Sequence, residues 1–367
     1  MQRKIPQLDA VRGVAVLMVL MIHASENHPY MHRLFSNGWM GVDLFFVLSG
    51  FLITGILLDT KQSEDYFKNF YARRCLRIWP LYYCTIFFML VIVPLLRPSE
   101  AAFFFQKSSP WWSYPLYLQN FLTPIPSMAA GSLGVTWSLA IEEQFYLIWP
   151  WVVWSFSGVH LRRIAIVVFC LSPPLRFLVM HHVNIYSNTF CRLDSLMAGA
   201  LLAILVRSEN FNSSKFIKQF WALFLISAPL ALITESMNAR WIVFTFTALA
   251  SAAFIYVAMF STQKWLQVVL RNRFLVYTGT ISYGLYLLHK IPYDIAPRLN
   301  FLAKHPILAL PIVIAASYVA AILSFNFFEK PFLNLKRFFE SKPVAAGQAG
   351  STARDPSFPA GMGDKIS

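Results

Sequence analysis

The chain has 367 residues, of which 57% are hydrophobic and only 13% are charged. Soluble domains carry about 25% charged residues, so this composition excludes a water-soluble globule of this size, and it also excludes disorder, collagen and a secreted disulfide scaffold. The net charge of +14 would indicate a nucleic-acid partner only if the basic residues gathered on one soluble face. They lie instead between apolar segments, which is typical of a membrane protein with several spans.

Apolar segments along the chain predict an all-α, polytopic transmembrane bundle of about ten helices. A span needs about 20 mostly apolar residues to cross roughly 30 Å of hydrocarbon. The sixth candidate is the weakest, because Arg192 and Asp194 lie at its start. The predicted spans are 8–26, 39–58, 78–97, 135–156, 164–180, 190–206, 219–235, 241–260, 274–292 and 306–328.

The basic residues between these spans predict their orientation. If the N-terminus is cytoplasmic, the connections on the cytoplasmic side hold about three times as many Lys and Arg residues as those on the other side. This bias favours an even number of spans with both termini in the cytoplasm. After residue 340 the composition changes to Gly, Ala, Pro, Ser and charged residues. We therefore expect a transmembrane domain over 1–340 and a disordered cytoplasmic tail over 341–367.

The first predicted helix carries three ionisable side chains, Asp9, Arg12 and His23. An ionisable group inside a bilayer costs at least about 2.5–3.5 kcal/mol, so each is a candidate functional residue. Arg12 and His23 are separated by close to three helical turns, so both project from one face, about 16 Å apart. Asp9 precedes Arg12 by three residues and can hold it in a salt bridge. The alternative is an Arg12 that extends to the inner interface and an ordinary interfacial histidine.

Other predicted helices also carry acidic groups. Asp43 lies in an otherwise apolar helix, so it must face protein or water. Glu142 and Glu143 lie about one turn into a further helix, and adjacent residues are 100° apart. One carboxylate is therefore expected to face the interior, while the other binds a neighbouring helix or caps the first turn. The helix dipole alone would explain one acidic residue in a first turn, but it explains two followed by Gln144 poorly.

Three arginines, Arg73, Arg74 and Arg77, lie at a predicted cytoplasmic helix end. Arg73 and Arg77 form an i,i+4 pair on one face, which suits a phosphate because a guanidinium can bind it through two parallel hydrogen bonds. The positive-inside rule alone would account for basic residues here, but the use of arginine three times without lysine favours anion binding. At the outer face, His289 closes the ninth predicted helix, where the adjacent Lys290 makes an interfacial position an adequate explanation.

Together these segments resemble the acyltransferase-3 family of integral membrane acyltransferases, which modify polysaccharides, lipopolysaccharide, peptidoglycan and some antibiotics. The resemblance covers roughly residues 5–335. Each motif alone is weak, whereas their order and spacing together are specific. The segments that carry the resemblance are Leu8-Asp9-Ala10-Val11-Arg12-Gly13 leading to His23, the run 41–54, Arg73-Arg74 with Arg77 and Pro80, and the runs 137–146 and 283–289.

The resemblance implies an enzyme of the inner membrane that takes an acyl group, with acetyl the expected one, from cytoplasmic acyl-coenzyme A. The expected acceptor is a hydroxyl of a cell-surface carbohydrate such as exopolysaccharide or lipopolysaccharide O-antigen. Transfer to a hydroxyl needs a base, and His23 is the expected one because histidine titrates near neutral pH. Arg12, held by Asp9, is expected to contact the donor or to stabilise negative charge on the thioester oxygen.

The remaining candidates follow from the same resemblance. Glu142 or Glu143 would orient the imidazole or the acceptor, and the arginines at 73, 74 and 77 would bind the phosphates of coenzyme A. Substrate contacts are expected from Asp43, Trp137, Ser138, Arg192, Tyr286 and His289. No metal is predicted, because the four cysteines form no CxxC pair and no ligand spacing with histidine. No nucleic-acid partner is predicted either.

Two other classes of function compete with this interpretation. A transporter of a lipid-linked sugar or small molecule could use the same Asp, Glu and His residues as a proton relay, although the sequence lacks the internal repeats of many transporters. A non-catalytic scaffold would not explain charges placed in helices at such cost. Direct attack by the acceptor is favoured over a Ser or Cys acyl-enzyme because no nucleophile motif is present. An acyl-histidine at His23 stays open, as do the acceptor and the acyl length.

Overall fold

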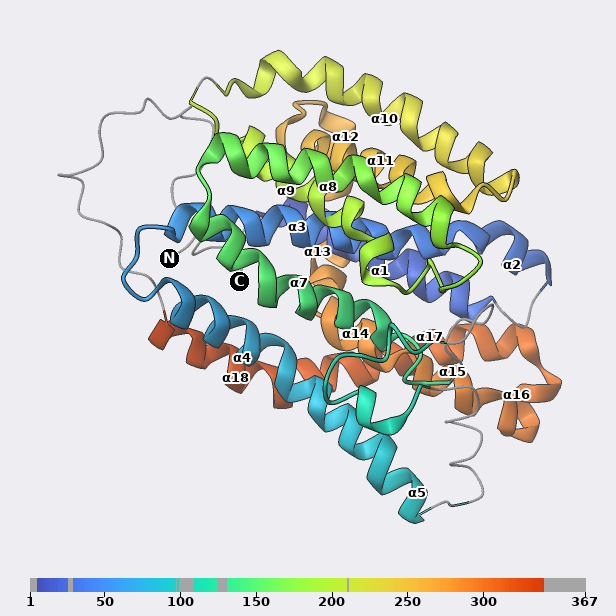
Figure 1. Ribbon diagram of the computed structural model, residues 1–367. Helices are drawn as coiled ribbons and strands as arrows, with labels where there is room; N and C mark the ends of the chain where they lie inside the picture. Colours follow the sequence, from blue (N-terminus) through green and yellow to red (C-terminus); the bar gives the residue numbers. More distant parts are fainter. Residues whose placement is uncertain are drawn as a thin grey trace.

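The computed structural model describes residues 5–25, 29–96, 98, 109–123, 131–209 and 211–339. Every regular element in these ranges is helical, which confirms the all-α prediction (Figure 1). The tail predicted at 341–367 lies outside them. The longer helices are α1 (Pro6–Ala24), α3 (Met40–Thr60), α4 (Tyr66–Phe87), α7 (Thr136–Ser155), α8 (Gly158–Val179), α9 (Leu193–Leu205), α10 (Ser213–Ser236), α11 (Arg240–Phe260) and α17 (Pro306–Leu323). The shorter ones are α2 (Pro29–Phe35), α5 (Val93–Leu96), α12 (Lys264–Leu270), α13 (Arg273–Thr280), α14 (Ser282–Leu288), α15 (Lys290–Ile295), α16 (Asn300–Lys304) and α18 (Lys330–Asn334).

Among the described residues, six helical runs are long and apolar enough to cross a membrane. They are Pro6–Ala24, Met31–Thr60, Tyr66–Leu96, Ser213–Ser236, Arg240–Phe260 and Leu308–Phe339. Crossing by the four other predicted spans stays a prediction. Helices α7 and α8 are long enough but carry charged residues, and α9 has only 13 residues. The segment predicted at 274–292 is divided at Ile281 into α13 and α14.

The helices pack around α1 and α3, which run through the middle of the molecule (Figure 1). In this view α8 to α11 cover one side of the pair, while α4, α14 and α17 lie on the other. The burial of the apolar stretches follows this order, since 89% of the α3 stretch is buried and only 11% of the α10 stretch is. Helix α3 is thus an interior helix, and α10 presents its apolar side chains at the periphery, where a membrane would cover them.

Two helix crossings are close enough to require glycine. Helix α1 meets α13 at Gly13 and Gly279, and α3 meets α9 at Gly50 and Gly199. A methyl group on any of these four residues would overlap a backbone carbonyl oxygen of the facing helix. Small residues that bring two backbones together are a common basis of helix packing in membranes, where packing contacts replace the hydrophobic drive.

Two helices widen into a π-helical turn directly before a proline. Helix α4 continues through Phe88–Ile92 into α5, which contains Pro94, and α17 continues through Ser324–Glu329 into α18, which contains Pro331. A proline cannot donate to the helix ladder, and its ring clashes with the carbonyl four residues earlier. The wider turn relieves this clash without ending the helix. The second run thereby carries a further short helical turn, Leu335–Phe339, back against α4.

Candidate active site

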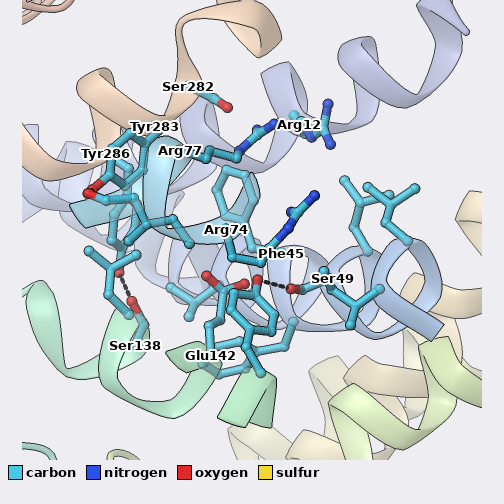
Figure 2. Close-up of a pocket in the computed structure, with 18 residues that line it drawn as sticks. Arg12, Phe45, Ser49, Arg74, Arg77, Ser138, Glu142, Ser282, Tyr283 and Tyr286 are labelled. Carbon is cyan, nitrogen blue, oxygen red and sulfur yellow. Dashed lines mark hydrogen bonds between the residues drawn. The ribbon is translucent and has the colours of Figure 1, made fainter. Parts of the chain in front are cut away.

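A cavity of about 100 Å³ lies between α1, α3, α4, α7 and α14. Apolar side chains, mostly from α3, form much of its wall, and polar side chains from all five helices project into it (Figure 2). The polar lining residues are Arg12, Ser49, Arg74, Arg77, Ser138, Glu142, Tyr146, Ser282, Tyr283 and Tyr286. Six of these, Arg12, Arg74, Arg77, Ser138, Glu142 and Tyr286, are residues that the sequence singles out.

Three lining residues form what we call the arginine cluster: Arg12 of α1 with Arg74 and Arg77 of α4. Figure 2 shows their side chains extending toward a common region of the cavity. Arg12 donates to Asp9 at 2.8 Å, so its charge is balanced one turn away. Arg74 and Arg77 form no ion pair within the described ranges, and Nε of Arg74 is buried without a partner. This part of the cavity therefore carries excess positive charge and suits an anionic group.

The pairing of arginines on α4 differs from the predicted one. The sequence predicts that Arg73 and Arg77 share a binding face, whereas Arg74 and Arg77 line the cavity and Arg73 does not. Arg73 is buried all the same, with 7% of its surface exposed. On a helical wheel Arg77 lies between the other two, and the cavity lies on the Arg74 side. Spacing alone gives no way to choose between these two flanks.

The three adjacent polar residues of α7 have three different partners. Glu142 lines the cavity, and it is close enough to Arg77 and Arg74 to interact with both electrostatically. Glu143 accepts a hydrogen bond of 3.0 Å from the indole of Trp79 on α4. Gln144 donates to Asn120 at 2.9 Å and so anchors the segment 109–123. The 100° step between neighbours separates the two carboxylates as the sequence predicts, with Glu142 toward the cavity.

Paired hydroxyl groups join α7 to its neighbours at the cavity wall. The hydroxyls of Ser138 and Tyr286 lie 2.6 Å apart and tie α7 to α14. Tyr286 also lies within 3.1 Å of the Val135 carbonyl, to which it can donate. Ser49 of α3 is hydrogen-bonded to Tyr146 of α7 in the same way. These hydroxyls offer donors and acceptors to a bound substrate and fix the separation of the helices.

His23 and His289 lie beside each other but do not line the cavity. Their ring centroids are 5.0 Å apart, and Nε2 of His289 is 3.3 Å from Nδ1 of His23. Tyr286 connects this pair to the cavity, because it lines the cavity and its ring lies 6.0 Å from that of His289. The structure thus brings together two histidines that are 266 positions apart in the chain.

Backbone carbonyls determine the tautomers of this histidine pair. Nδ1 of His289 lies 2.7 Å from the Tyr286 carbonyl, and Nδ1 of His23 lies 2.8 Å from the Val19 carbonyl. A carbonyl oxygen only accepts hydrogen bonds, so both Nδ1 atoms carry hydrogen. Nε2 of His289 can then only share the single Nδ1–H of His23, as the longer contact of 3.3 Å beside the 2.8 Å bond to the Val19 carbonyl. In neutral His23 the basic lone pair is therefore on Nε2.

Besides His289, three further predicted substrate contacts do not line the cavity. Asp43 and Arg192 are fully buried and form an ion pair of 2.7 Å, and Ser195 donates to the same carboxylate at 2.7 Å. The guanidinium of Arg192 also lies 3.9 Å from the ring centre of Phe244. Trp137 packs against other aromatic rings. The Asp43–Arg192 pair joins α3 to the start of α9 and has no access to a substrate in this arrangement.

Several lining residues were missed because the sequence reasoning followed charge. Tyr146 lies one turn after Glu142, and Ser282 lies one turn before Tyr286, so helical spacing could have placed both on the cavity. Lys336, in the turn Leu335–Phe339, is buried near the arginine cluster. The sequence places it in a basic segment that is predicted to be cytoplasmic, where lysines are expected from the positive-inside rule alone. Within the described ranges no group of three His, Cys, Asp or Glu residues could hold a metal ion.

Comparisons with known proteins place the chain in a family. The sequence profile of the acyltransferase domain family, acyltransferase-3, matches residues 5–326. The chain is 29% identical to the peptidoglycan O-acetyltransferase OatA of Listeria monocytogenes, over 93% of this chain and 58% of that protein. It is 28% identical to a Bacillus subtilis protein whose name proposes the same activity, over 90% of this chain and 55% of that protein.

The chain therefore spans little more than half the length of these curated relatives. No solved structure matches it. The profile match covers most of the chain and contains every residue that lines the cavity. By this match the chain belongs to the acyltransferase-3 family of membrane acyltransferases.

Proposed function

We propose that the protein is an O-acyltransferase that moves an acetyl group from cytoplasmic acetyl-coenzyme A to a hydroxyl of a cell-surface carbohydrate. The observation that carries the proposal is the cavity, in which the arginine cluster and Glu142 line one space next to a histidine pair. Membership of the family supports acyl transfer. The names of the relatives favour acetyl as the group and peptidoglycan as the acceptor.

The donor enters this cavity from the side of the arginine cluster. Its phosphates bind Arg74 and Arg77, whose charges have no ion-pair partner among the described residues. The thioester lies at the end of a flexible arm, away from the phosphates, and this arm extends along the cavity past Glu142 toward Tyr286. Arg12, held by Asp9, extends into the same region of the cavity as Arg74 and Arg77 and stabilises negative charge on the donor.

His23 is the base in this proposal. Its Nε2 takes the proton of the acceptor hydroxyl while the hydroxyl oxygen attacks the thioester carbonyl, so that the new C–O bond forms as the C–S bond breaks. Coenzyme A leaves as a thiolate and receives the proton from the imidazolium. His289 orients the imidazole of His23 through the bond between Nε2 and Nδ1. Ser138 and Tyr286 contact the reacting groups at the cavity end nearest the histidines.

The remaining polar residues stabilise the machinery. Glu142 orients a substrate in the cavity, and Glu143 holds α7 against α4 through Trp79. We assign Asp43 and Arg192 to the helix bundle rather than to a substrate, because both are fully buried in a mutual ion pair.

We place the enzyme in the inner membrane, with both termini in the cytoplasm. Placing the arginine cluster at the cytoplasmic side follows the positive-inside rule and gives the donor direct access. The acceptor then reaches the histidine pair from the lipid or the outer side.

Replacement of His23 tests the proposal most directly. We expect His23→Ala to lower acetyl transfer at least about 100-fold, the usual size of a general-base contribution, while the protein remains folded in the membrane. The measurement is transfer of labelled acetyl from acetyl-coenzyme A to glycan in isolated membranes. His32→Ala is the matched control, since His32 is exposed and should keep wild-type activity.

Two results would contradict the proposal. Near wild-type transfer by His23→Ala would contradict the role of His23 as the base. Absence of label on any glycan or lipid with the wild-type protein would remove the enzymatic function and would favour a transporter that uses the buried carboxylates and histidines as a proton relay.

A further inference from the structure

Lys336 is a buried cation with no partner. Only 6% of its surface is exposed, and Nζ makes no hydrogen bond with any residue that the structure describes. It lies near the end of the helical run Leu308–Phe339, which has 32 residues. Because about 20 residues cross the hydrocarbon, the last turns of this run extend past it. Lys336 therefore belongs to the end of the bundle, where its turn packs against α4.

Burial of this ammonium is costly, because an isolated charge loses its hydration and gains nothing in return. Its surroundings increase the cost. Four guanidinium groups are close enough to repel it electrostatically, and they belong to Arg12, Arg73, Arg74 and Arg77. Nε of Arg74 is likewise buried without a partner. Two orphan donors thus lie within one group of cations.

No neighbouring carboxylate forms an ion pair with Lys336, Arg74 or Arg77 among the described residues. Asp9 is bound to Arg12 at 2.8 Å. Glu329, seven residues before Lys336, accepts a hydrogen bond of 2.9 Å from Ser324. Glu142 and Glu143 belong to α7, and neither forms an ion pair with a described residue. Nζ of Lys336 and Nε of Arg74 therefore have no acceptor among the described residues, and a bound anion would supply one.

A phosphate group has the chemistry that this site lacks. It carries up to two negative charges and several acceptor oxygens, so one group can accept from a lysine and from an arginine at once. Lysine adds a compact point charge to the planar forks of the arginines. We propose that Lys336 binds a phosphate of the acyl donor and thereby makes the C-terminal helical segment part of the donor site. This inference rests on the proposed function, because the donor named there carries the phosphates.

The test compares two donors that differ in their phosphates. Acetyl-coenzyme A carries three phosphate groups, whereas acetyl-pantetheine carries the same thioester and none. For Lys336→Met we expect the KM for acetyl-coenzyme A to rise about tenfold, the size of one charge-assisted hydrogen bond, with kcat little changed. With acetyl-pantetheine the variant and the wild type should behave alike. Lys336→Arg should restore most of the affinity.

Lys330→Met is the matched control, because Lys330 is exposed and lies in the same helical run. It should leave both donors unaffected. An unchanged KM for acetyl-coenzyme A in Lys336→Met would overturn the inference. Equal losses with both donors, together with a lower melting temperature, would identify a merely structural lysine and would overturn it as well.

A binding measurement without catalysis separates this inference from the proposed function. Adenosine 3′,5′-bisphosphate should raise the melting temperature of the purified wild-type protein and raise that of Lys336→Met clearly less. Without ligand, Lys336→Met should melt roughly 2 °C higher, because a buried orphan charge has been removed. If the wild type transfers no acetyl group but the melting temperatures follow this pattern, the proposed acyl transfer is contradicted and the phosphate site at Lys336 is supported. If acetyl transfer occurs but the melting temperatures do not follow this pattern, only the proposed role of Lys336 is contradicted.

Discussion

Two groups of buried charges in this molecule differ in how they are balanced. The arginine cluster lines a cavity, and two of its three cations have no ion-pair partner among the described residues. A second group lies among α3, α8, α9 and α11 and is not part of that cavity. We call it the paired cluster, and it consists of Asp43, Arg176, Arg192 and Asp194. Its two ion pairs, of 2.7 and 2.8 Å, join side chains that are all fully buried.

The difference shows that burial of a charge in an apolar helix does not by itself mark a functional site. In the paired cluster each cation has an anion, and Thr245 also donates to Asp194 at 2.7 Å. Nε and Nη1 of Arg192 have no hydrogen-bond partner among the described residues, but the charge of Arg192 is balanced by Asp43. Such a group specifies how helices pack. In the arginine cluster the missing partner must come from outside the described chain. Imbalance of charge, more than its presence, therefore points to the ligand.

Breaking the paired cluster should have the largest effect on stability. Asp43→Ala leaves Arg192 buried without its anion, and removal of one partner of such a pair typically costs about 3–5 kcal/mol. We expect a strongly lowered melting temperature in detergent and little folded protein in the membrane. Asp43→Leu combined with Arg192→Met should recover much of the loss, because both charges are then gone.

The Asp59–Arg207 pair supplies the control for this comparison. Its separation of 2.8 Å matches that of the paired cluster, but 15% and 25% of the two side chains are exposed. Asp59→Ala should therefore cost less than about 1 kcal/mol. Equal destabilisation by Asp43→Ala and Asp59→Ala would show that burial does not determine how much each ion pair contributes to the free energy of unfolding.

Local sequence patterns predict contacts around the arginine cluster better than those of the paired cluster. The Asp9–Arg12 pair follows from a three-residue spacing, and the split between Glu142 and Glu143 follows from the helical step. Asp43 and Arg192 are 149 positions apart, and no spacing rule joins residues at that distance. The sequence therefore indicates that burying either charge in a membrane helix costs free energy. It does not indicate that the two side chains form an ion pair that offsets this cost.

The composition and apolar segments likewise predict the helical fold, but not its packing. The position of a short helix such as α14 is set by packing against neighbours that spacing along the chain does not identify. The choice of Arg74 over Arg73 depends on the rotation of α4 about its axis, and the burial of Lys336 depends on how the run after Pro331 returns to α4. Both are consequences of tertiary packing, which spacing along the chain does not predict.

Separating α3 from α9 should weaken the paired cluster without touching the arginine cluster. In Gly199→Ala the added methyl group would overlap the Val47 carbonyl, so the helices must move apart and the Asp43–Arg192 pair must lengthen. We expect a loss of about 2 kcal/mol, in the range of overpacked cores, measured by thermal unfolding. Gly158→Ala is the control, because no atom lies within 4 Å of its added methyl group. A donor affinity that falls as much as the stability would contradict the independence of the two clusters.

The smallest expected effect separates two neighbouring arginines of α4. Arg74 and Arg73 are buried to nearly the same degree, with 8% and 7% of their surfaces exposed, but only Arg74 lines the cavity. We expect Arg74→Met to weaken coenzyme A binding about tenfold, or about 1.4 kcal/mol, the size of one charge-assisted hydrogen bond, with no loss of stability in the ligand-free protein. Arg73→Met should weaken it less than about threefold. Calorimetric titration of both variants measures the difference, and equal losses would mean that the whole basic face of α4, rather than its cavity edge, recognises the donor.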